Sequence, residues 1–246
     1  MLPHPTLATH YATPEAKPEF VNRLFDRGAR HYDAVVDWGF LGSGAAYRRW
    51  ALQQHGLRPG HRLLDVACGT GLVAVAATEI LRTAAGITCL DPSAGMLAVA
   101  RTKLPATFLL GRAEQLPLPD DSFDFLTMGY ALRHVTSLED TFREYHRVLK
   151  PGGQLLILEI TKPAGRIGNF FFRLYFRHLY PFLTRLFTRS TDARDMMRYY
   201  WETMDACVSP AAVLAALSAA GLTAVKRHVV LGLFSEYTAV KPALSP

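Results

Sequence analysis

A short apolar segment that runs through a carboxylate into a glycine turn constrains this chain more than any other feature. The segment covers residues 62–71 and reads R-L-L-D-V-A-C-G-T-G. Its apolar part, 63–66, predicts a short buried strand. Gly69 and Gly71 allow the backbone to bend tightly and to approach a ligand without a Cβ in the way. We therefore predict a strand, a ligand-binding turn and a helix that begins at about Leu72.

The amino-acid sequence of this turn indicates which ligand it binds. Turns that hold a dinucleotide read G-x-G-x-x-G and place a pyrophosphate at the N-terminus of the following helix. This turn instead reads D-x-A-x-G-x-G, and Asp65 would repel a pyrophosphate. S-adenosylmethionine carries an ammonium and a sulfonium, so it suits a site beside a carboxylate. The alternative is a glycine turn that only packs a helix against a sheet.

A second acidic residue follows at the distance of one strand-helix-strand unit. Asp91 ends the apolar run 86–90 and lies 26 residues after Asp65. A ribose-binding acid occupies this position in nucleotide-binding α/β folds. Pro92 and Ser93 then open a helix, so we expect both carboxylate oxygens of Asp91 to be free to accept ribose hydroxyls.

Length and composition predict a single α/β domain. The chain has 246 residues, of which 50% are apolar and 20% charged, enough for one sizeable core. Its three cysteines, Cys68, Cys89 and Cys207, have no paired or metal-ligand spacing, which is typical of reduced, intracellular thiols. The N-terminal residues show no basic stretch before a hydrophobic run, so we expect a cytoplasmic protein. The histidines show no paired metal spacing, and we predict no metal site.

Strand and helix patterns alternate regularly after the glycine turn, which predicts a doubly wound, mostly parallel sheet. Ser137 predicts the N-cap of a helix that ends before Pro151. Strands are expected at about 61–66, 86–90, 106–110, 123–128 and 154–160, followed by a hairpin at 225–230 and 236–240.

These patterns divide the chain. Residues 1–18 are rich in proline and threonine and predict a loose arm. The remainder, 19–246, is predicted to form one domain. Its parts are lid helices (19–56), a cofactor-binding core (57–160), a basic aromatic helical insertion (161–208), and a C-terminal helix with the strand hairpin (209–246).

The basic charge is concentrated in the insertion. The net charge is +6, and residues 161–200 hold eight Lys or Arg against two Asp. Over 166–189, arginines recur at four-residue spacing beside aromatic residues, with Pro181 expected to break the helix in two. This pattern is typical of a helix in the interface of an anionic membrane, here at its inner face. A core helix with a solvated arginine face is the alternative. No recognised nucleic-acid-binding module is present in the sequence, so we expect no nucleic-acid partner.

With these motifs placed, the chain resembles the class I S-adenosylmethionine-dependent methyltransferases and, within them, the ubiquinone/menaquinone biosynthesis C-methyltransferase family. The resemblance extends over about 25–241. It implies a Rossmann-like, seven-stranded sheet whose last strand is antiparallel, and methyl transfer to a ring carbon of a prenylated phenol, a small lipophilic aromatic substrate. The motifs that carry it are AEQLP at 113–117, DDSFD at 120–124, ALRHVT at 131–136 and RVLKPGG at 147–153.

The resemblance also implies roles for single residues. Tyr32 and Asp33 match the family's N-terminal Tyr-Asp pair and Arg133 its active-site arginine; with His134 they are the candidate catalytic residues. Asp65, Ala67, Gly69 and Gly71 would hold the methionine end of the cofactor, Asp91 the ribose, and Met96 would pack near the adenine. The predicted cofactor-binding set also includes Cys68, Pro92, Arg112, Ala113 and Glu114.

Two positions depart from the family pattern. Arg112 stands where many relatives have Asp or Asn to accept a hydrogen bond from the adenine amino group, which an arginine cannot do. The backbone amide of Ala113 and stacking would then hold the adenine, or the Arg112 side chain turns outward. His134 stands where the quinone enzymes have Asn. Its imidazole suits removal of a phenolic proton, or it serves only as a hydrogen-bonding scaffold.

Three functions are compatible with these observations. The first is C-methylation of a lipophilic phenol or quinol in ubiquinone or menaquinone biosynthesis. The second is C-, O- or N-methylation of a specialised metabolite such as a polyketide or terpenoid. The third is a non-catalytic, cofactor-binding accessory subunit of a biosynthetic complex, with Arg112 as the mark of weakened cofactor binding. Assembly as a homodimer or within such a complex is left open.

Overall fold

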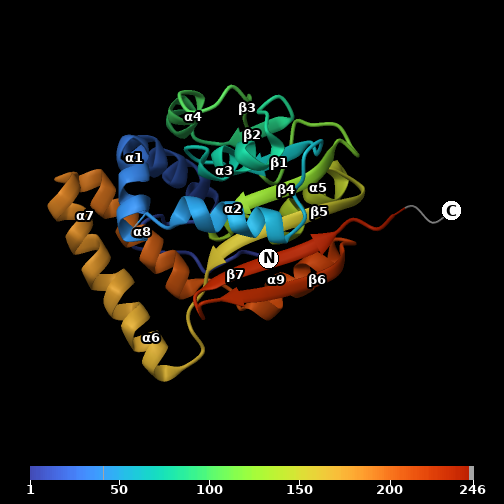
Figure 1. Cartoon of the computed structure of the whole chain (residues 1–246). Helices are drawn as coiled ribbons and strands as arrows, with labels where there is room; N and C mark the ends of the chain where they lie inside the picture. Colours follow the sequence, from blue (N-terminus) through green and yellow to red (C-terminus); the bar gives the residue numbers. More distant parts are fainter. Residues whose placement is uncertain (41, 244–246) are drawn as a thin grey trace.

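One mixed sheet organises the molecule. The structure, a computed structural model, describes residues 1–40 and 42–243. Leu41, in the predicted lid segment 19–56, and 244–246, at the predicted domain end, lie outside the described residues. Within that part, the strand order is β3-β2-β1-β4-β5-β7-β6, parallel from β3 to β5 and antiparallel at β7 (Figure 1). This confirms the predicted fold class. The strands are β1 (Leu63–Val66), β2 (Ile87–Asp91), β3 (Thr107–Leu110), β4 (Phe123–Gly129), β5 (Leu149–Ile160), β6 (Thr223–Val230) and β7 (Phe234–Val240).

Helices cover both faces of the sheet and one end of it (Figure 1). In the order of the chain they are η1 (Pro14–Ala16), α1 (Lys17–Gly39), α2 (Gly44–Gln54), α3 (Leu72–Leu81), α4 (Ala94–Arg101), η2 (Leu132–His134), α5 (Leu138–Val148), α6 (Arg166–Arg173), the π-helix η3 (Leu174–Leu179), α7 (Tyr180–Thr188), α8 (Thr191–Ala206) and α9 (Pro210–Ala219).

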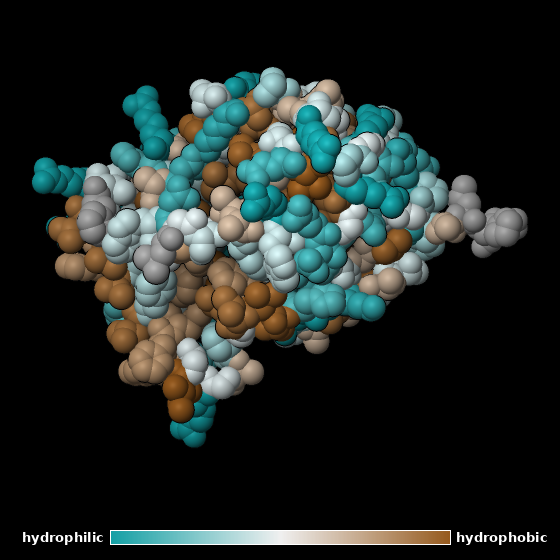
Figure 2. Space-filling view, in the orientation of Figure 1, coloured by the Kyte–Doolittle hydropathy of each residue, from teal (hydrophilic) through white to brown (hydrophobic). Residues whose placement is uncertain are grey.

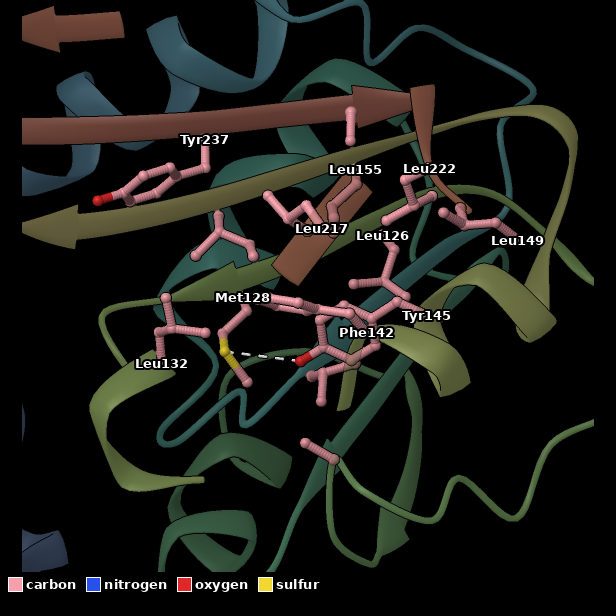
Figure 3. Packing of buried hydrophobic residues seen from close by; sticks show 14 of the residues in the cluster. Leu126, Met128, Leu132, Phe142, Tyr145, Leu149, Leu155, Leu217, Leu222 and Tyr237 are labelled. Carbon is pink, nitrogen blue, oxygen red and sulfur yellow. Dashed lines mark hydrogen bonds between the residues drawn. The ribbon is translucent and has the colours of Figure 1, made fainter. Parts of the chain in front are cut away.

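The core has two layers because the central strands are apolar on both faces. Leu63 packs with α2 and α3, whereas its neighbour Leu64 points to the opposite face, toward α5 and α9. On that second face, Tyr145 of α5 lies against β4 and donates a hydrogen bond to the sulfur of Met128 at 3.5 Å (Figure 3). The Ser137 hydroxyl caps α5 by accepting from the Asp140 amide, as predicted. The two apolar layers pack on opposite faces of the sheet and so fix the positions of the carboxyl ends of its central strands.

A third apolar cluster joins the lid to the insertion. Residues of α1 pack against α6, η3 and α8, and the Tyr180 hydroxyl donates to the carbonyl of Val35 at 2.9 Å. The helix break predicted at Pro181 is wrong, because the backbone stays helical from α6 through the π-helix η3 into α7, with Pro181 in the first turn of α7. The Tyr180 amide donates to the carbonyl of Tyr175, five residues earlier, so the wider π-helical turn precedes the proline, whose ring fixes φ near the helical value.

The first 18 residues, for which the sequence predicts a loose arm, lie against the body. The carbonyls of Met1 and Pro3 accept hydrogen bonds from Leu138 at 3.0 Å and Val208 at 2.8 Å. His4 is buried, and desolvation, followed by the charge of Lys17, lowers its pKa to about 4. The arm therefore packs as part of the fold.

None of the helices in the described ranges combines the length and the apolar character needed to cross a bilayer.

Candidate active site

The turn between β1 and α3 is tight and leaves space above it. Ala67, Gly69 and Gly71 all adopt left-handed φ values, of +52°, +55° and +81°. A Cβ added at Gly69 would meet no atom within 4 Å, so the space over this residue can take a ligand. A Cβ at Gly71 would lie 3.3 Å from Ala100 and Leu104, so this glycine allows the turn to pack closely.

Asp91 links this turn to the next helix. Its Oδ2 accepts from the Gly69 amide at 2.7 Å and its Oδ1 from the Ser93 amide at 2.8 Å. The prediction that both oxygens are free is therefore wrong, because the carboxylate also orders the backbone around it. Each oxygen keeps a further acceptor position. Burial raises the pKa of Asp91 to about 6, although the hydrogen bonds from the two backbone amides act to lower it.

Asp65 is buried inside β1 with one oxygen unpaired. Its Oδ1 accepts from the Thr127 hydroxyl at 2.9 Å, and its Oδ2 has no hydrogen-bond partner. Burial raises the pKa of this carboxyl to about 7, which the Thr127 bond opposes only in part. A cation nearby would favour the ionised form.

Two adjoining cavities of about 70 and 60 Å³ lie over the carboxyl ends of β1, β2 and β4. The strand order reverses between β1 and β4, which is where open α/β sheets bind ligands. The predicted residues that line the cavities are Tyr32, Ala67, Gly69, Asp91, Pro92, Met96, Arg112, Ala113, Glu114 and His134. The predicted residues Asp33, Asp65, Cys68, Gly71 and Arg133 do not line them. We refer to the two together as the strand-end cavity.

Arg112 lines the strand-end cavity beside Glu114. The guanidinium donates to the Thr136 hydroxyl at 3.0 Å and lies 3.4 Å from the Glu114 carboxylate. Burial opposes ionisation of Glu114, yet bonds from the Thr136 amide and hydroxyl keep its pKa below the usual value. The side chain of Arg112 is thus held along the wall by its neighbours.

His134 forms part of the wall that the strand-end cavity shares with the lid. Its ring stacks on Tyr199 at 5.5 Å between centroids and meets Phe25 edge-on at 5.2 Å. Burial lowers the pKa of His134 well below its ordinary value, and the charges of Arg133 and Lys17 lower it further. A neutral imidazole with so low a pKa accepts a proton poorly, which favours the scaffold interpretation.

We expect His134→Asn to keep turnover within about threefold of wild type, because the ring lines the strand-end cavity and is not poised as a base. The pH dependence of the rate should keep its acidic limb. A loss of roughly 10²–10⁴-fold together with loss of that limb would instead identify His134 as the base. Steady-state rates over a pH series for both proteins decide between these outcomes.

Arg133 lies beneath the cavity wall and is paired there. It is 1% exposed, and its guanidinium donates to Glu159 of β5 at 2.6 Å. Its guanidinium carbon lies 3.9 Å from the ring centroid of Tyr200, and Tyr200 lines the cavity. Burial opposes the charge of Arg133, but Glu159 keeps its pKa above the usual value. Arg133 thus supports the site through Tyr200.

Tyr32 and Asp33 are adjacent in the sequence but have different positions and partners. Tyr32 lines the cavity, and burial raises its pKa, so its hydroxyl stays protonated. Asp33 accepts from the Thr70 hydroxyl at 2.5 Å and forms an ion pair with Lys103. Asp33 therefore fastens α1 to the glycine turn.

A larger cavity of about 360 Å³ adjoins the strand-end cavity, and we call it the aromatic cavity. Both are lined by Tyr32, Tyr130 and Tyr200. Trp50 and Leu231 also line the aromatic cavity and are 44% and 87% exposed, so they lie on its solvent side. The remaining lining residues are Val36, Phe40, Ser43, Gly44, Ala46, Tyr47, Arg48, Tyr180, Met197 and Phe234.

Sequence reasoning missed several of these residues. Tyr130 directly follows β4, so its place at the end of a predicted strand was a usable signal. Arg48 and Tyr200 come from α2 and α8, and their part in the site depends on how these helices dock. Among the described residues, no group of three or more His, Cys, Asp or Glu is placed to hold a metal ion.

The groups in and beneath the wall of the strand-end cavity suit the chemistry of S-adenosylmethionine. Asp65 has a buried, unpaired oxygen near the turn, which suits a cationic group. Gly69 leaves open space beside it, and Asp91 presents its carboxylate to the cavity, where hydroxyls can donate to it.

Comparison with known proteins agrees with this geometry. The model of the ubiE/COQ5 methyltransferase family matches residues 13–241. A demethylmenaquinone methyltransferase of Symbiobacterium thermophilum is 38% identical over 178 residues, which cover 70% of this chain and 71% of that protein. A ubiquinone/menaquinone biosynthesis C-methyltransferase of Pseudomonas savastanoi pv. phaseolicola is 31% identical over 95% of both chains.

Solved structures share the fold. A phosphoethanolamine N-methyltransferase 2 of Haemonchus contortus, in complex with S-adenosyl-L-methionine, has a TM-score of 0.65 at 17% identity, covering 92% of this chain and 60% of that one. A methyltransferase of Thermotoga maritima, described as a possible histamine N-methyltransferase, has a TM-score of 0.62 at 21% identity, covering 89% and 99%. With the family model matching nearly the whole length, the chain belongs to the ubiE/COQ5 methyltransferase family and is an S-adenosylmethionine-dependent methyltransferase.

Proposed function

We propose that this enzyme methylates a ring carbon of a phenol or quinol that carries an apolar tail, in ubiquinone or menaquinone biosynthesis. The aromatic cavity carries this proposal. It has room for a substituted ring, and the three tyrosines that line both cavities place its inner end beside the strand-end cavity. Its solvent side is apolar, which suits a prenyl tail that leaves the protein there. The names of the two relatives support the same substrate class.

In this proposal the strand-end cavity binds the cofactor and the aromatic cavity binds the acceptor ring. When bound, S-adenosylmethionine supplies a methyl group whose bond to sulfur breaks as the acceptor carbon donates its electron pair. Asp65 and Asp91 would hold the cationic and ribose parts of that cofactor. The three shared tyrosines, Tyr32, Tyr130 and Tyr200, would orient the ring and exclude water. Burial raises the pKa of all three, so each offers a neutral hydroxyl.

Methylation of a reduced, short-chain demethylmenaquinone or of the corresponding ubiquinol precursor tests the proposal. The purified protein with S-adenosylmethionine should give a product one methylene heavier, with the methyl group on the ring carbon by tandem mass spectrometry. Lipids of a deletion strain should contain the demethylated quinone. An unchanged quinone profile, with methylation of a polyketide or terpenoid by the pure enzyme, would favour the specialised-metabolite alternative.

A tryptophan at position 46 should block the acceptor and leave the cofactor bound. Ala45 and Ala46 are both exposed, but only Ala46 lines the aromatic cavity. Ala46→Trp should lower kcat/KM for the quinol at least tenfold, because the indole occupies the space of the ring. Affinity for S-adenosylhomocysteine, measured by calorimetry, should stay within twofold. Ala45→Trp is the matched control and should match wild type in both measurements; equal effects of the two variants would contradict this use of the cavity.

We further propose that 166–189 docks on an anionic membrane surface. The arginines at 166, 173, 177, 185 and 189 are exposed, and no acidic residue lies between 161 and 191. Large apolar side chains of the same helices face solvent, including Ile167 at 75% and Phe170 and Phe182 at 63% each. Figure 2 shows apolar surface along α6 and α7, at the left of the view. Tyr180 of α7 also lines the aromatic cavity, so the same helix forms part of the wall of that cavity.

We expect the protein to sediment with anionic vesicles, weakly with neutral ones, and to be released by high salt, since salt screens arginine attraction to headgroups. Phe170→Ser with Phe182→Ser should reduce binding to anionic vesicles at least tenfold. Leu110→Ser, on β3, removes another apolar residue that is 63% exposed and should have no effect. Equal binding to both vesicle types would count against an anionic surface.

A further inference from the structure

Arg48 is a buried cation that forms no ion pair within the described residues, although its charge acts to lower the pKa of the buried Asp65 carboxyl. It lies on α2, is 5% exposed and lines the aromatic cavity. Its Nε has no hydrogen-bond partner, and throughout 1–40 and 42–243 no carboxylate forms an ion pair with it. The guanidinium carbon lies 5.6 Å from the ring centroid of Tyr130, on the wall shared with the strand-end cavity. The charge therefore sits at the inner end of the aromatic cavity.

The other arginines nearby are used differently. Arg133 is buried as well, but Glu159 neutralises it at 2.6 Å, and it lines neither cavity. Arg49, the next residue along α2, is exposed and pairs with Glu79 at 2.6 Å. A charge taken out of water without a partner reduces stability. An anionic ligand in the aromatic cavity would supply the partner that Arg48 lacks.

The remaining polar groups around the aromatic cavity are neutral. Of the described residues that line it, Arg48 alone carries a formal charge at neutral pH. The Tyr47 hydroxyl donates to Glu236 at 2.8 Å, so it is already engaged. Glu236 in turn also contacts His55 at 2.7 Å. An acceptor that enters the cavity as an anion would thus meet one opposite charge, at one place.

We propose that Arg48 binds the deprotonated ring oxygen of the acceptor. The inference rests on the proposed function, since it needs an acceptor with an ionisable ring hydroxyl. The hydroxyl loses its proton to solvent, and the anion is stabilised by the guanidinium. The ring carbon then uses its electron pair to form the bond to the methyl group while the methyl–sulfur bond breaks and the sulfur keeps that bond's electron pair. The carbon afterwards releases its own proton to solvent to restore the aromatic ring. Arg48 thereby makes the carbon nucleophilic and fixes which carbon faces the strand-end cavity.

Arg48→Met tests this directly because it removes the charge and keeps much of the volume. Its thermal midpoint should equal or exceed that of wild type, since an unpaired buried charge is lost. Affinity for S-adenosylhomocysteine should stay within twofold, while kcat/KM for the quinol falls at least a hundredfold. Arg49→Met is the matched control and should keep wild-type kcat/KM. Gly44→Ala keeps the charge but would place a Cβ 2.8 Å from the Arg48 Nη1, so we expect a smaller loss.

A chromophoric phenol reports ionisation without methyl transfer. We would titrate 2-octyl-4-nitrophenol bound to each protein and follow the phenolate absorbance. The acid dissociation constant of the bound phenol should be at least tenfold larger in wild type than in Arg48→Met, with Arg49→Met like wild type.

These readouts separate the two proposals. Equal dissociation constants, or a quinol turnover that survives in Arg48→Met, would overturn the role of Arg48 while leaving the proposed function intact. A tenfold difference in a protein that methylates no quinol would support the oxyanion site and refute the proposed substrate.

Discussion

Replacing Arg133 by methionine is expected to lower the free energy of unfolding by about 3–5 kcal/mol, the cost of breaking a buried ion pair by removing one partner. Glu159 would be left 4% exposed without its cation. The Leu132 amide at 2.9 Å would be its main remaining partner. Denaturant unfolding of wild type and variant measures the difference.

The loss of stability in Arg133→Met should become larger as the pH rises. Burial already raises the pKa of Glu159 above its usual value, and Arg133 works against that rise. Without Arg133 the folded-state pKa rises further, so the folded state binds a proton that the unfolded state releases. Stability of the variant is then best below the unfolded-state pKa and falls as pH rises through the folded-state value.

The double variant Arg133→Met, Glu159→Leu is the control for this prediction. It removes both charges and should be less destabilised than Arg133→Met alone. An Arg133→Met protein as stable as wild type at every pH would show that the pair contributes nothing to the fold, and Arg133 would then be a candidate for direct contact with the acceptor.

Asp91→Ala should weaken binding of S-adenosylhomocysteine by about a hundredfold or more. Charge-assisted hydrogen bonds to ribose hydroxyls contribute about 1.5–3 kcal/mol each, and the variant loses them. It also loses the bonds that fix the Gly69 and Ser93 amides. Titration calorimetry measures the affinity.

Asp91→Asn gives the matched comparison, because it keeps one acceptor oxygen and nearly the same shape. Its affinity should lie between those of wild type and Asp91→Ala. Affinity within twofold of wild type in Asp91→Ala would remove this residue from the cofactor site.

Much of the fold could be predicted because its signals are local. The strands at 63–66, 87–91 and 107–110 lie within two residues of their predicted bounds, since each is a short apolar run between turn residues. β5 begins at Leu149, well before the predicted 154, because Leu149 already pairs with Phe123 on β4. That pairing depends on a neighbouring strand and has no signature within the segment itself.

The residues of the site likewise fall into those with a local sequence signal and those whose position depends on tertiary packing. Asp91 and Gly69 could be placed from strand ends and a glycine turn. Arg48, which lines the aromatic cavity, could not be identified from the sequence. It differs from its neighbour Arg49 only in the face of α2 on which it lies once that helix has packed against the domain. Arg133 shows the converse, since the burial of its charge depends on Glu159, 26 residues later on β5.

The packed N-terminal arm has a consequence for how the protein is made. Lys17, at the start of α1, donates to the carbonyls of Arg133 and Val135, and Pro3 accepts from Val208. These partners leave the ribosome about 200 residues after the arm in the latest case, which takes roughly 10–40 s at about 5–20 residues per second. Until then the wall beside His134 lacks its outer support, so a nascent chain reaches cofactor-binding competence only near the end of its synthesis.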